Sequence, residues 1–333
     1  MIEHGGALDR AIAEFGGARA DWIDLSTGIN PNPYPLPKLA PDVWTRLPDS
    51  ALEAKAIAAA RAHYGFGEKA GVTAAPGTQA LIQLYPHLAP PGNAMVIGPT
   101  YEEHAQSLGF AGRDLRYERS LSSLDDEDMI AVVVNPNNPD GKAIPADALL
   151  FAAERLAERG GLLVVDEAFA DTNSKDSVAA HAGMDGLLVL KSFGKFFGLA
   201  GVRLGFAAGT PELTGVLSAM LGPWAVSGPA LAIASGAYRD EAWITAARTR
   251  LATDRRALEA GLKAAGLQLL GGTDLFVLAR HFQAAHIWRE LAERHILVRK
   301  FDHTADWLRF GLPKDEAGLS RLKLALAEIL GAL

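Results

Sequence analysis

The sequence contains no cysteine among its 333 residues. Disulfide bonds and thiolate metal sites are therefore excluded, and the absence fits a reducing compartment. The nine histidines are scattered, and no HExxH motif occurs among them. Without cysteines or clustered histidines, the sequence offers no set of ligands typical of a metal centre. We therefore expect no metal.

The sequence also has no excess of basic residues and no long apolar run. Its 39 acidic residues outnumber the 32 basic ones, which gives a formal net charge of −7. This balance argues against non-specific nucleic-acid binding. No apolar run is long enough to cross a membrane, and the N-terminal sequence lacks the apolar core of a signal peptide. We expect a cytoplasmic protein that binds neither nucleic acid nor membrane.

The residues that are present suffice for a large core, since 49% are hydrophobic and 21% are charged. The length allows two domains. Residues 1–43 are rich in glycine and proline, which predicts an arm that packs on the small domain or on a partner subunit. We expect a large domain over residues 44–225 and a small domain over residues 226–333, which includes an interdomain helix.

Apolar strands alternate with helices in the predicted large domain, which indicates an α/β fold with a mainly parallel sheet covered on both faces. Ser50–Tyr64 reads as a helix with Ser50 as its N-cap, and Pro145–Arg159 has helical periodicity. The predicted strands are Gly71–Ala74, Ala94–Ile97, Ile130–Val134, Leu162–Val165 and Gly186–Leu190.

The remaining third of the chain has a different pattern. Residues 230–265 are mostly helical, and shorter strands and helices follow them, which predicts a compact α+β domain. We expect strands at Leu275–Ala279, Ile296–Arg299 and Trp307–Phe310, and helices at Gln283–Arg294 and Lys314–Leu330.

Polar residues follow the C-terminal ends of the predicted parallel strands. Ligands of open α/β sheets bind at that edge, so we expect these side chains to converge there. They are Thr78, Tyr101, Asn138, Asp166 and Lys195.

The stretch VLKSFGKFFGLAGVRLGF, at Val189–Phe206, carries the chemistry. A lysine in a partly apolar turn can be desolvated, which frees its amine as a nucleophile. Ser192 and Arg203 flank Lys195 and suit a phosphate group. A lysine beside a phosphate cradle fits pyridoxal phosphate, whereas the plain alternative is a surface-loop lysine.

A second phosphate candidate is the turn Pro-Gly-Thr-Gln that enters a predicted helix. Gly77, Thr78 and Gln79 would present free N–H groups at the helix start. An ordinary threonine N-cap explains the same residues equally well.

Together these motifs resemble a known family. SFGKFFGLAGVRLGF, NPNNPDG, DEAF and PGTQA are similar to the fold-type-I enzymes that use pyridoxal 5'-phosphate (PLP), in the branch with histidinol-phosphate aminotransferase. The likeness covers nearly the whole chain in the right order. The resemblance implies the fold of these enzymes, a large domain with a mainly parallel sheet and a smaller α+β domain. Within that branch, HGG and DLSTGINPNPYP resemble the threonine-phosphate decarboxylases of cobalamin biosynthesis.

The resemblance implies a role for each matching residue around the cofactor. Lys195 would form an imine with it and later move protons, and Asp166 would pair with the pyridine nitrogen. Asn138 would bind the ring hydroxyl oxygen, and Tyr101 would stack on the ring. The phosphate would be held by Gly77, Thr78, Gln79, Ser192 and Arg203.

The resemblance also implies substrate-binding residues and a homodimer as the assembly. In the aminotransferases the position of Arg309 binds the substrate carboxylate. For the anionic groups of a phosphorylated amino acid, the candidates are His4, Gly28, Asn30, Arg299 and Arg309.

Two positions depart from the pattern of the aminotransferases. Phe169 stands where they have a tyrosine whose hydroxyl meets the ring oxygen, and Leu47 stands where many have a tyrosine that reaches the neighbouring subunit's phosphate. Both departures weaken a simple aminotransferase assignment.

We therefore expect a lyase that decarboxylates O-phospho-L-threonine to (R)-1-aminopropan-2-ol phosphate. The alternative is an aminotransferase acting on histidinol phosphate or a related amino acid, which would use the same cofactor site. A non-catalytic PLP-binding module is a third reading, but it would need a DNA-binding domain for which we find no residues.

Overall fold

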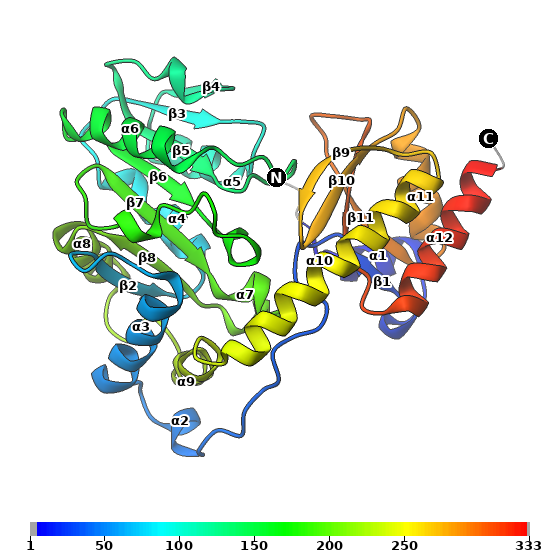
Figure 1. Cartoon of the computed structure of the whole chain (residues 1–333), viewed down its shortest axis with the longest axis horizontal. Helices are drawn as coiled ribbons and strands as arrows, with labels where there is room; N and C mark the ends of the chain where they lie inside the picture. The colour runs from blue at the N-terminus through cyan, green and yellow to red at the C-terminus, as the bar shows by residue number, and fades with distance from the viewer. Residues whose placement is uncertain (1–4, 332–333) are drawn as a thin grey trace. The chain divides into compact units, whose positions relative to one another are not determined.

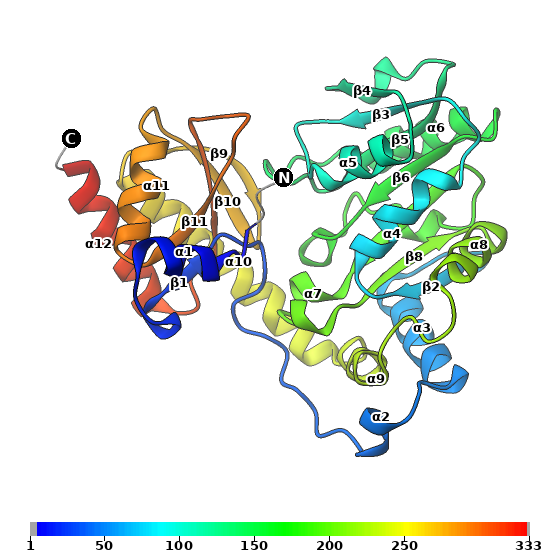
Figure 2. The same ribbon diagram turned by 180° about the vertical axis from the view of Figure 1, so that it is seen from behind.

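The computed structural model describes residues 5–331, and the chain divides into two compact units. The large unit comprises Tyr34–Asn138 and Lys142–Ile244 (Figures 1 and 2). The small unit comprises the chain from Thr245 onward, the short piece Pro139–Gly141, and the N-terminal segment that ends at Pro33. Residues 226–244 therefore lie in the large unit, although we predicted them in the small domain.

The large unit is built on a seven-stranded sheet in the order β2-β8-β7-β6-β5-β3-β4. All neighbours are parallel except at β8, which runs antiparallel to both β2 and β7. The predicted strands are confirmed to within two residues at each end. The strands are β2 (Gly71–Ala75), β3 (Asn93–Ile97), β4 (Leu115–Glu118), β5 (Asp128–Val134), β6 (Leu162–Asp166), β7 (Leu187–Ser192) and β8 (Gly205–Gly209).

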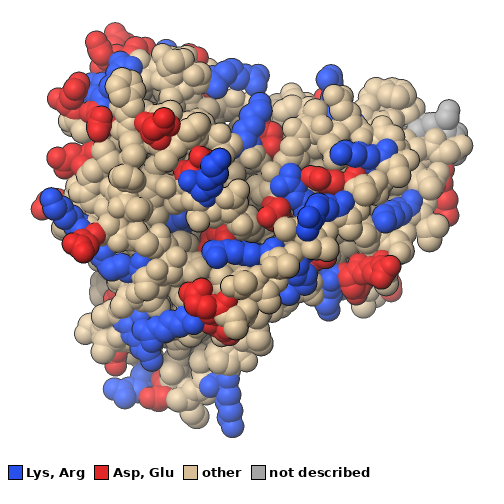
Figure 3. Space-filling model, viewed as in Figure 1, with Lys and Arg blue, Asp and Glu red and all other residues tan. Residues whose placement is uncertain are grey.

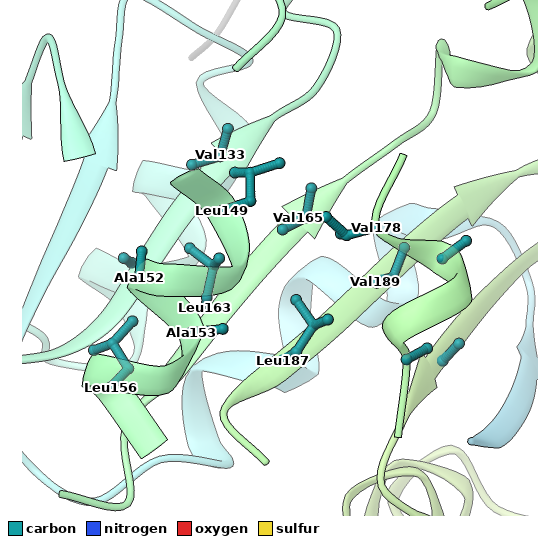
Figure 4. Close-up of a cluster of buried hydrophobic side chains, with 14 of the residues drawn as sticks. Val133, Leu149, Ala152, Ala153, Leu156, Leu163, Val165, Val178, Leu187 and Val189 are labelled. Atoms are coloured by element: carbon teal, nitrogen blue, oxygen red, sulfur yellow. The ribbon is translucent and has the colours of Figure 1, made fainter. Parts of the chain in front are cut away.

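Both faces of this sheet are buried, because alternate side chains of the central strands enter two separate apolar clusters. On one face Leu163, Val165 and Val189 pack against Leu149 and Leu156 of α6 (Figure 4). The other face packs against α4 and α5. The helices of this unit are α2 (Asp42–Thr45), α3 (Ser50–Tyr64), α4 (Thr78–Leu84), α5 (Glu103–Phe110), α6 (Ala146–Ala157), α7 (Phe193–Phe196), α8 (Pro211–Leu221) and α9 (Gly228–Ala237).

The small unit holds a five-stranded sheet in the order β1-β11-β12-β10-β9. Only the pair β1–β11 is parallel. The helix α10 (Glu241–Ala264) begins in the large unit and continues into the small one. The other elements are α1 (Leu8–Phe15), β1 (Ile23–Leu25), β9 (Gln268–Thr273), β10 (Phe276–Arg280), α11 (Ala284–Glu293), β11 (Ile296–Lys300), β12 (Trp307–Gly311) and α12 (Glu316–Gly331).

Several local expectations are corrected by the structure. Only part of the predicted arm over residues 1–43 belongs to the small unit: α1 packs with residues of α11 and β11, and β1 pairs with β11, whereas residues 34–43 belong to the large unit. The prediction that residues 230–265 are mostly helical is confirmed, and they form two helices with a break at Tyr238–Asp240. The strand β8 escaped prediction because its sequence, GFAAG, has no β-branched residue.

Two expectations from the composition concern the distribution of charged residues and the absence of a membrane-spanning helix. Lysine, arginine, aspartate and glutamate are interspersed over the face drawn in Figure 3. Within residues 5–331, no helix combines the length and the apolar character required to cross a bilayer.

The N-cap of α3 provides a test of the local structure. Asp49, not Ser50, is the N-cap, since its Oδ1 accepts a hydrogen bond of 2.8 Å from the Leu52 N–H. We expect Asp49→Ala to lower the free energy of unfolding by about 1 kcal/mol. The matched control Ser50→Ala should lower it by less than half as much, because Ser50 is already inside the helix. Denaturant melts measure both, and equal losses would contradict the assignment.

Candidate active site

Asp166 is the last residue of β6 and lies between two neighbouring strands. It pairs in register with Val134 of β5 and Leu190 of β7. Asp166 is 3% exposed, and its Oδ1 accepts a hydrogen bond of 3.0 Å from the Ala168 N–H. The apolar run of β6 thus carries a carboxylate to the C-terminal edge of the sheet and keeps it out of bulk water.

The second partner of Asp166 is His104, which the sequence reasoning missed. His104 lies in the first turn of α5, is fully buried, and places Nε2 3.0 Å from Asp166 Oδ2. The only local signal was its position three residues after Tyr101, a spacing that brings two residues to one side of a helical turn. Its ring meets the Tyr101 ring edge-on, with centroids 6.1 Å apart.

Tyr101 is held by the side chain of Gln79. The Tyr101 hydroxyl donates to Gln79 Oε1 at 3.3 Å, and Gln79 Nε2 donates to Glu103 Oε2 at 2.6 Å. The side-chain amide of Gln79 is therefore engaged with these two residues. Its expected part in binding a phosphate rests on its backbone N–H alone.

Lys195 lies in the short helix α7 and is half-buried. Its Nζ is 5.6 Å from the centroid of the Phe169 ring, a cation–π distance. Phe169 is buried and has no hydroxyl, so this side of the lysine is apolar. Phe197 stacks on Phe193 and on Trp243, with ring centroids 4.6 Å and 5.5 Å apart, so aromatic side chains pack around the turn that carries the lysine.

The predicted phosphate residues meet where α4 begins beside β8. Gly77 has a φ of +83°, and a Cβ there would lie 2.7 Å from Arg203 Nη2. A Cβ on Gly205 would lie 2.7 Å from the Thr78 nitrogen. Gly205 pairs in register with Ser192, the last residue of β7. The backbone of Gly77 and Thr78, the Arg203 guanidinium and Ser192 therefore lie close together, and this set of donors fits a phosphate.

Asn138 lies in the turn after β5, and that turn is tied to the turn that carries Tyr101. Thr100 Oγ1 donates to Asn137 Oδ1 at 2.6 Å, and Asn137 Nδ2 donates to the Pro99 carbonyl at 3.0 Å. Asn138, the next residue, is half-buried. The large unit therefore links the candidates at the ends of β3 and β5, as the strand pattern predicts.

A buried ion pair lies on the opposite face of the sheet. Lys191 Nζ donates to Glu167 Oε2, and the Val178 N–H donates to Glu167 Oε1 at 2.7 Å. Both charged side chains are almost fully buried. Because Glu167 follows Asp166 and Lys191 precedes Ser192, this pair fixes the ends of β6 and β7 relative to each other. Sequence reasoning missed it.

Two arginines face each other in the small unit. Arg299 of β11 and Arg309 of β12 are directly paired in register. Arg309 is 7% exposed, and its Nη2 donates to the Ser26 carbonyl at 2.8 Å. Burial, with the charge of Arg299 as the second cause, lowers the pKa of Arg309 to about 9, against the opposite effect of Asp24. Two like charges so close favour the binding of an anion.

The other substrate candidates lie in the N-terminal segment of the same unit. Asn30 is 2% exposed, and its Oδ1 accepts a hydrogen bond from the Asn32 N–H at 3.0 Å. Gly28 is buried. His4 lies outside the described residues, but the next residues of the HGG motif contact Ser26, since the Gly6 N–H donates to Ser26 Oγ at 2.7 Å.

Neither unit contains a candidate metal site among the described residues, as no three histidine or acidic side chains are grouped suitably. The donors described above are a lysine amine, a carboxylate and a phosphate cradle at one edge of the large sheet. This set fits PLP, with an amine for its carbonyl carbon and a carboxylate for its ring nitrogen.

Comparisons with known proteins agree with this chemistry. The family model for aminotransferase class I and II matches residues 20–322. A threonine-phosphate decarboxylase of a Sinorhizobium species is 46% identical over 331 residues, which covers 98% of each chain. Another, of Pseudomonas aeruginosa, is 44% identical over 98% of this chain and 97% of its own. A solved histidinol-phosphate aminotransferase of Sinorhizobium meliloti in complex with pyridoxal-5'-phosphate matches with a TM-score of 0.83 at 20% identity, over 100% of this chain and 95% of its own.

The pair Arg299 and Arg309 allows a test of how burial of a charge affects the stability of the fold. The charge of Arg309 is retained below about pH 9, so the cost of burying it beside Arg299 is fully present at pH 7. As pH rises through about 9 the folded state loses this proton before the unfolded state does, and stability should rise. At pH 7, Arg309→Met should leave the folded protein as stable or stabilise it by roughly 1–3 kcal/mol.

The same variant should lose the stabilisation that an anion provides. We expect inorganic phosphate to raise the Tm of the wild-type holoenzyme and to raise that of Arg309→Met much less. The exposed Arg289 gives the control, because Arg289→Met removes a positive charge from the same unit without touching the pair. An equal phosphate effect in all three proteins would show that the arginine pair does not bind anions.

Proposed function

The chain belongs to the aminotransferase class I and II family, and we propose that within it this protein is a lyase that decarboxylates O-phospho-L-threonine. Its fold is the fold-type-I fold expected from the motifs, and its cofactor is PLP. The product would be (R)-1-aminopropan-2-ol phosphate, a step in cobalamin biosynthesis. The observation that carries the proposal is the identity of 46% and 44% to threonine-phosphate decarboxylases over nearly the whole chain.

The residues of the large unit have the properties that such a reaction requires. When bound, the cofactor accepts the electron pair of the bond that breaks at the α-carbon of the substrate. We assign Lys195 to hold the cofactor's carbonyl carbon and then to move a proton to the α-carbon. Asp166 would face the ring nitrogen and stabilise a positive charge there. Asn138 would bind the ring oxygen, and Tyr101 would cover one face of the ring.

The cofactor's phosphate would be held by Gly77, Thr78, Ser192 and Arg203, with the backbone N–H of Gln79.

In the small unit, Arg299 and Arg309 would bind the carboxylate and the phosphate of the substrate, since a guanidinium offers a permanent charge and a paired donor geometry to each. Gly28, Asn30 and His4 would complete the contacts to these anionic groups. The choice of bond then depends on which substituent of the α-carbon these contacts hold perpendicular to the ring.

An aminotransferase acting on histidinol phosphate would use the same cofactor site and break a different bond. Phe169 favours the lyase over this alternative. Its apolar ring lies against Lys195 at 5.6 Å, where a tyrosine would supply a hydroxyl to the cofactor. Leu47, 66% exposed, likewise has no hydroxyl to offer a neighbouring subunit.

We further propose a cytoplasmic homodimer. Leu36, Trp44 and Leu47, each 66% exposed, lie close in sequence within the large unit. Large apolar side chains exposed in this way are typical of surfaces that a second subunit covers.

The proposal predicts sustained turnover without an amino acceptor. Wild-type enzyme given O-phospho-L-threonine and no keto acid should release CO₂ over many turnovers, and no keto acid should form. An aminotransferase would instead stop after one equivalent, because its cofactor would be left in the amine form. Lys195→Ala is the control: it should fold, lose the visible absorption of the lysine-bound cofactor, and release no CO₂. A stall of the wild type after a single turnover would overturn the lyase assignment.

A further inference from the structure

Tyr85 stands at the end of a hydrogen-bonded chain that leads to Asp166. It opens the short 3₁₀ segment Tyr85–His87, directly after α4, and its side chain is fully buried. The Tyr85 hydroxyl lies 3.1 Å from His104 Nδ1, and His104 Nε2 lies 3.0 Å from Asp166 Oδ2. The three residues come from three different elements, so folding of the whole unit is needed to assemble them.

For a neutral imidazole at His104, the chemistry of these groups determines the direction of both hydrogen bonds. An ionised carboxylate can only accept, so Nε2 of His104 must carry the proton that points to Asp166. A neutral imidazole protonated at Nε2 has a lone pair at Nδ1, which then needs a donor. Tyr85 supplies it, because burial first, and the charge of Asp166 second, raise the pKa of its hydroxyl well above the usual range. The hydroxyl therefore remains protonated.

Among the contacts that the structure describes, no other side chain near His104 forms a hydrogen bond with its ring nitrogens. The Tyr101 ring meets the imidazole edge-on and is bonded through its own hydroxyl to Gln79. The neighbouring Glu103 carboxylate is turned to Gln79, at 2.6 Å. The Tyr85 ring itself lies 5.8 Å from the imidazole, centroid to centroid.

We propose that Tyr85 is a positioning residue that holds His104 in the tautomer protonated at Nε2, so that Asp166 keeps its negative charge toward the cofactor's ring nitrogen. The inference rests on the proposed role of Asp166. It does not depend on whether the carboxylate or a hydrogen leaves the α-carbon. Without the Tyr85 donor, the proton could occupy Nδ1 and leave a lone pair facing the carboxylate. A second proton could instead enter the ring and draw charge away from Asp166.

The tautomer can be measured directly in the holoenzyme. Protein labelled with ¹⁵N-histidine gives separate Nδ1 and Nε2 signals, and the His104 signals are identified by their loss in His104→Leu. We expect wild-type His104 to be protonated at Nε2 alone, and Tyr85→Phe to shift both signals. This readout needs no turnover, so it stands even if the proposed reaction is wrong. A wild-type His104 protonated at Nδ1 would overturn the proposal whether or not Tyr85→Phe folds.

Kinetics test whether Tyr85 acts through His104. In the decarboxylation assay, Tyr85→Phe should lower kcat roughly tenfold and change KM by less than about twofold. In the His104→Leu background the same change should have almost no effect on kcat, since its only route to Asp166 is already lost.

Tyr238→Phe is the matched control, because Tyr238 is also buried and its hydroxyl is bonded to another side chain, Tyr64, at 3.0 Å. It should leave kcat and the His104 signals unchanged. An equal fall in kcat for Tyr85→Phe in both backgrounds would contradict the proposal, as would unchanged His104 signals in Tyr85→Phe.

Discussion

The architecture of the large unit depends on how two adjacent carboxylates are accommodated at the end of β6. Asp166 ends a strand that is buried on both faces and Glu167 follows it, and the alternation of side chains along an extended chain turns the two to opposite sides. Each would be costly to bury alone. Glu167 is compensated by Lys191 and by two donors from residues 177 and 178, whereas Asp166 receives one N–H from the chain and one from His104. The contacts of Glu167 fix the ends of β6 and β7, whereas those of Asp166 leave its carboxylate available for a ligand.

The small unit presents the opposite problem, because two positive charges lie close together on neighbouring strands. Arg299 and Arg309 face each other across two strands, and the lowered pKa of Arg309 records the cost. A protein selected for stability alone would replace such a pair with apolar residues. The presence of the pair is explained if a doubly anionic substrate binds beside it. Binding energy from the remote phosphate can then orient the α-carbon, which is how a shared cofactor site achieves a specific bond cleavage.

The parallel-strand pattern made much of the site predictable. Apolar runs located β3, β5, β6 and β7, and Tyr101, Asn138, Asp166 and Lys195 were found after these runs, because parallel strands end at the same edge of a sheet. Pairings between side chains were not predictable in this way. His104 lies on α5, a helix that the short and weakly amphipathic sequence EHAQSLGF did not indicate. Its partner is 62 residues away in the chain.

The same limit applies to smaller features. Asp49 and Ser50 are both good N-caps, and only backbone geometry shows that Asp49 is used. Glu167 and Lys191 lie just after the strands predicted at Leu162–Val165 and Gly186–Leu190, and a buried ion pair leaves no periodic signal. Local rules thus locate elements and their ends, whereas contacts between distant elements decide which polar residue serves which partner.

The central claim is that the carboxylate, and not the hydrogen, leaves the α-carbon of the substrate. Turnover of O-phospho-L-threonine in ²H₂O, stopped at half conversion and analysed by NMR, tests it directly. We predict one deuterium at the former α-carbon of the product and none at the α-carbon of the remaining substrate, since that C–H bond is never broken. Deuterium in the recovered O-phospho-L-threonine would show that the enzyme removes the hydrogen, and would contradict the account.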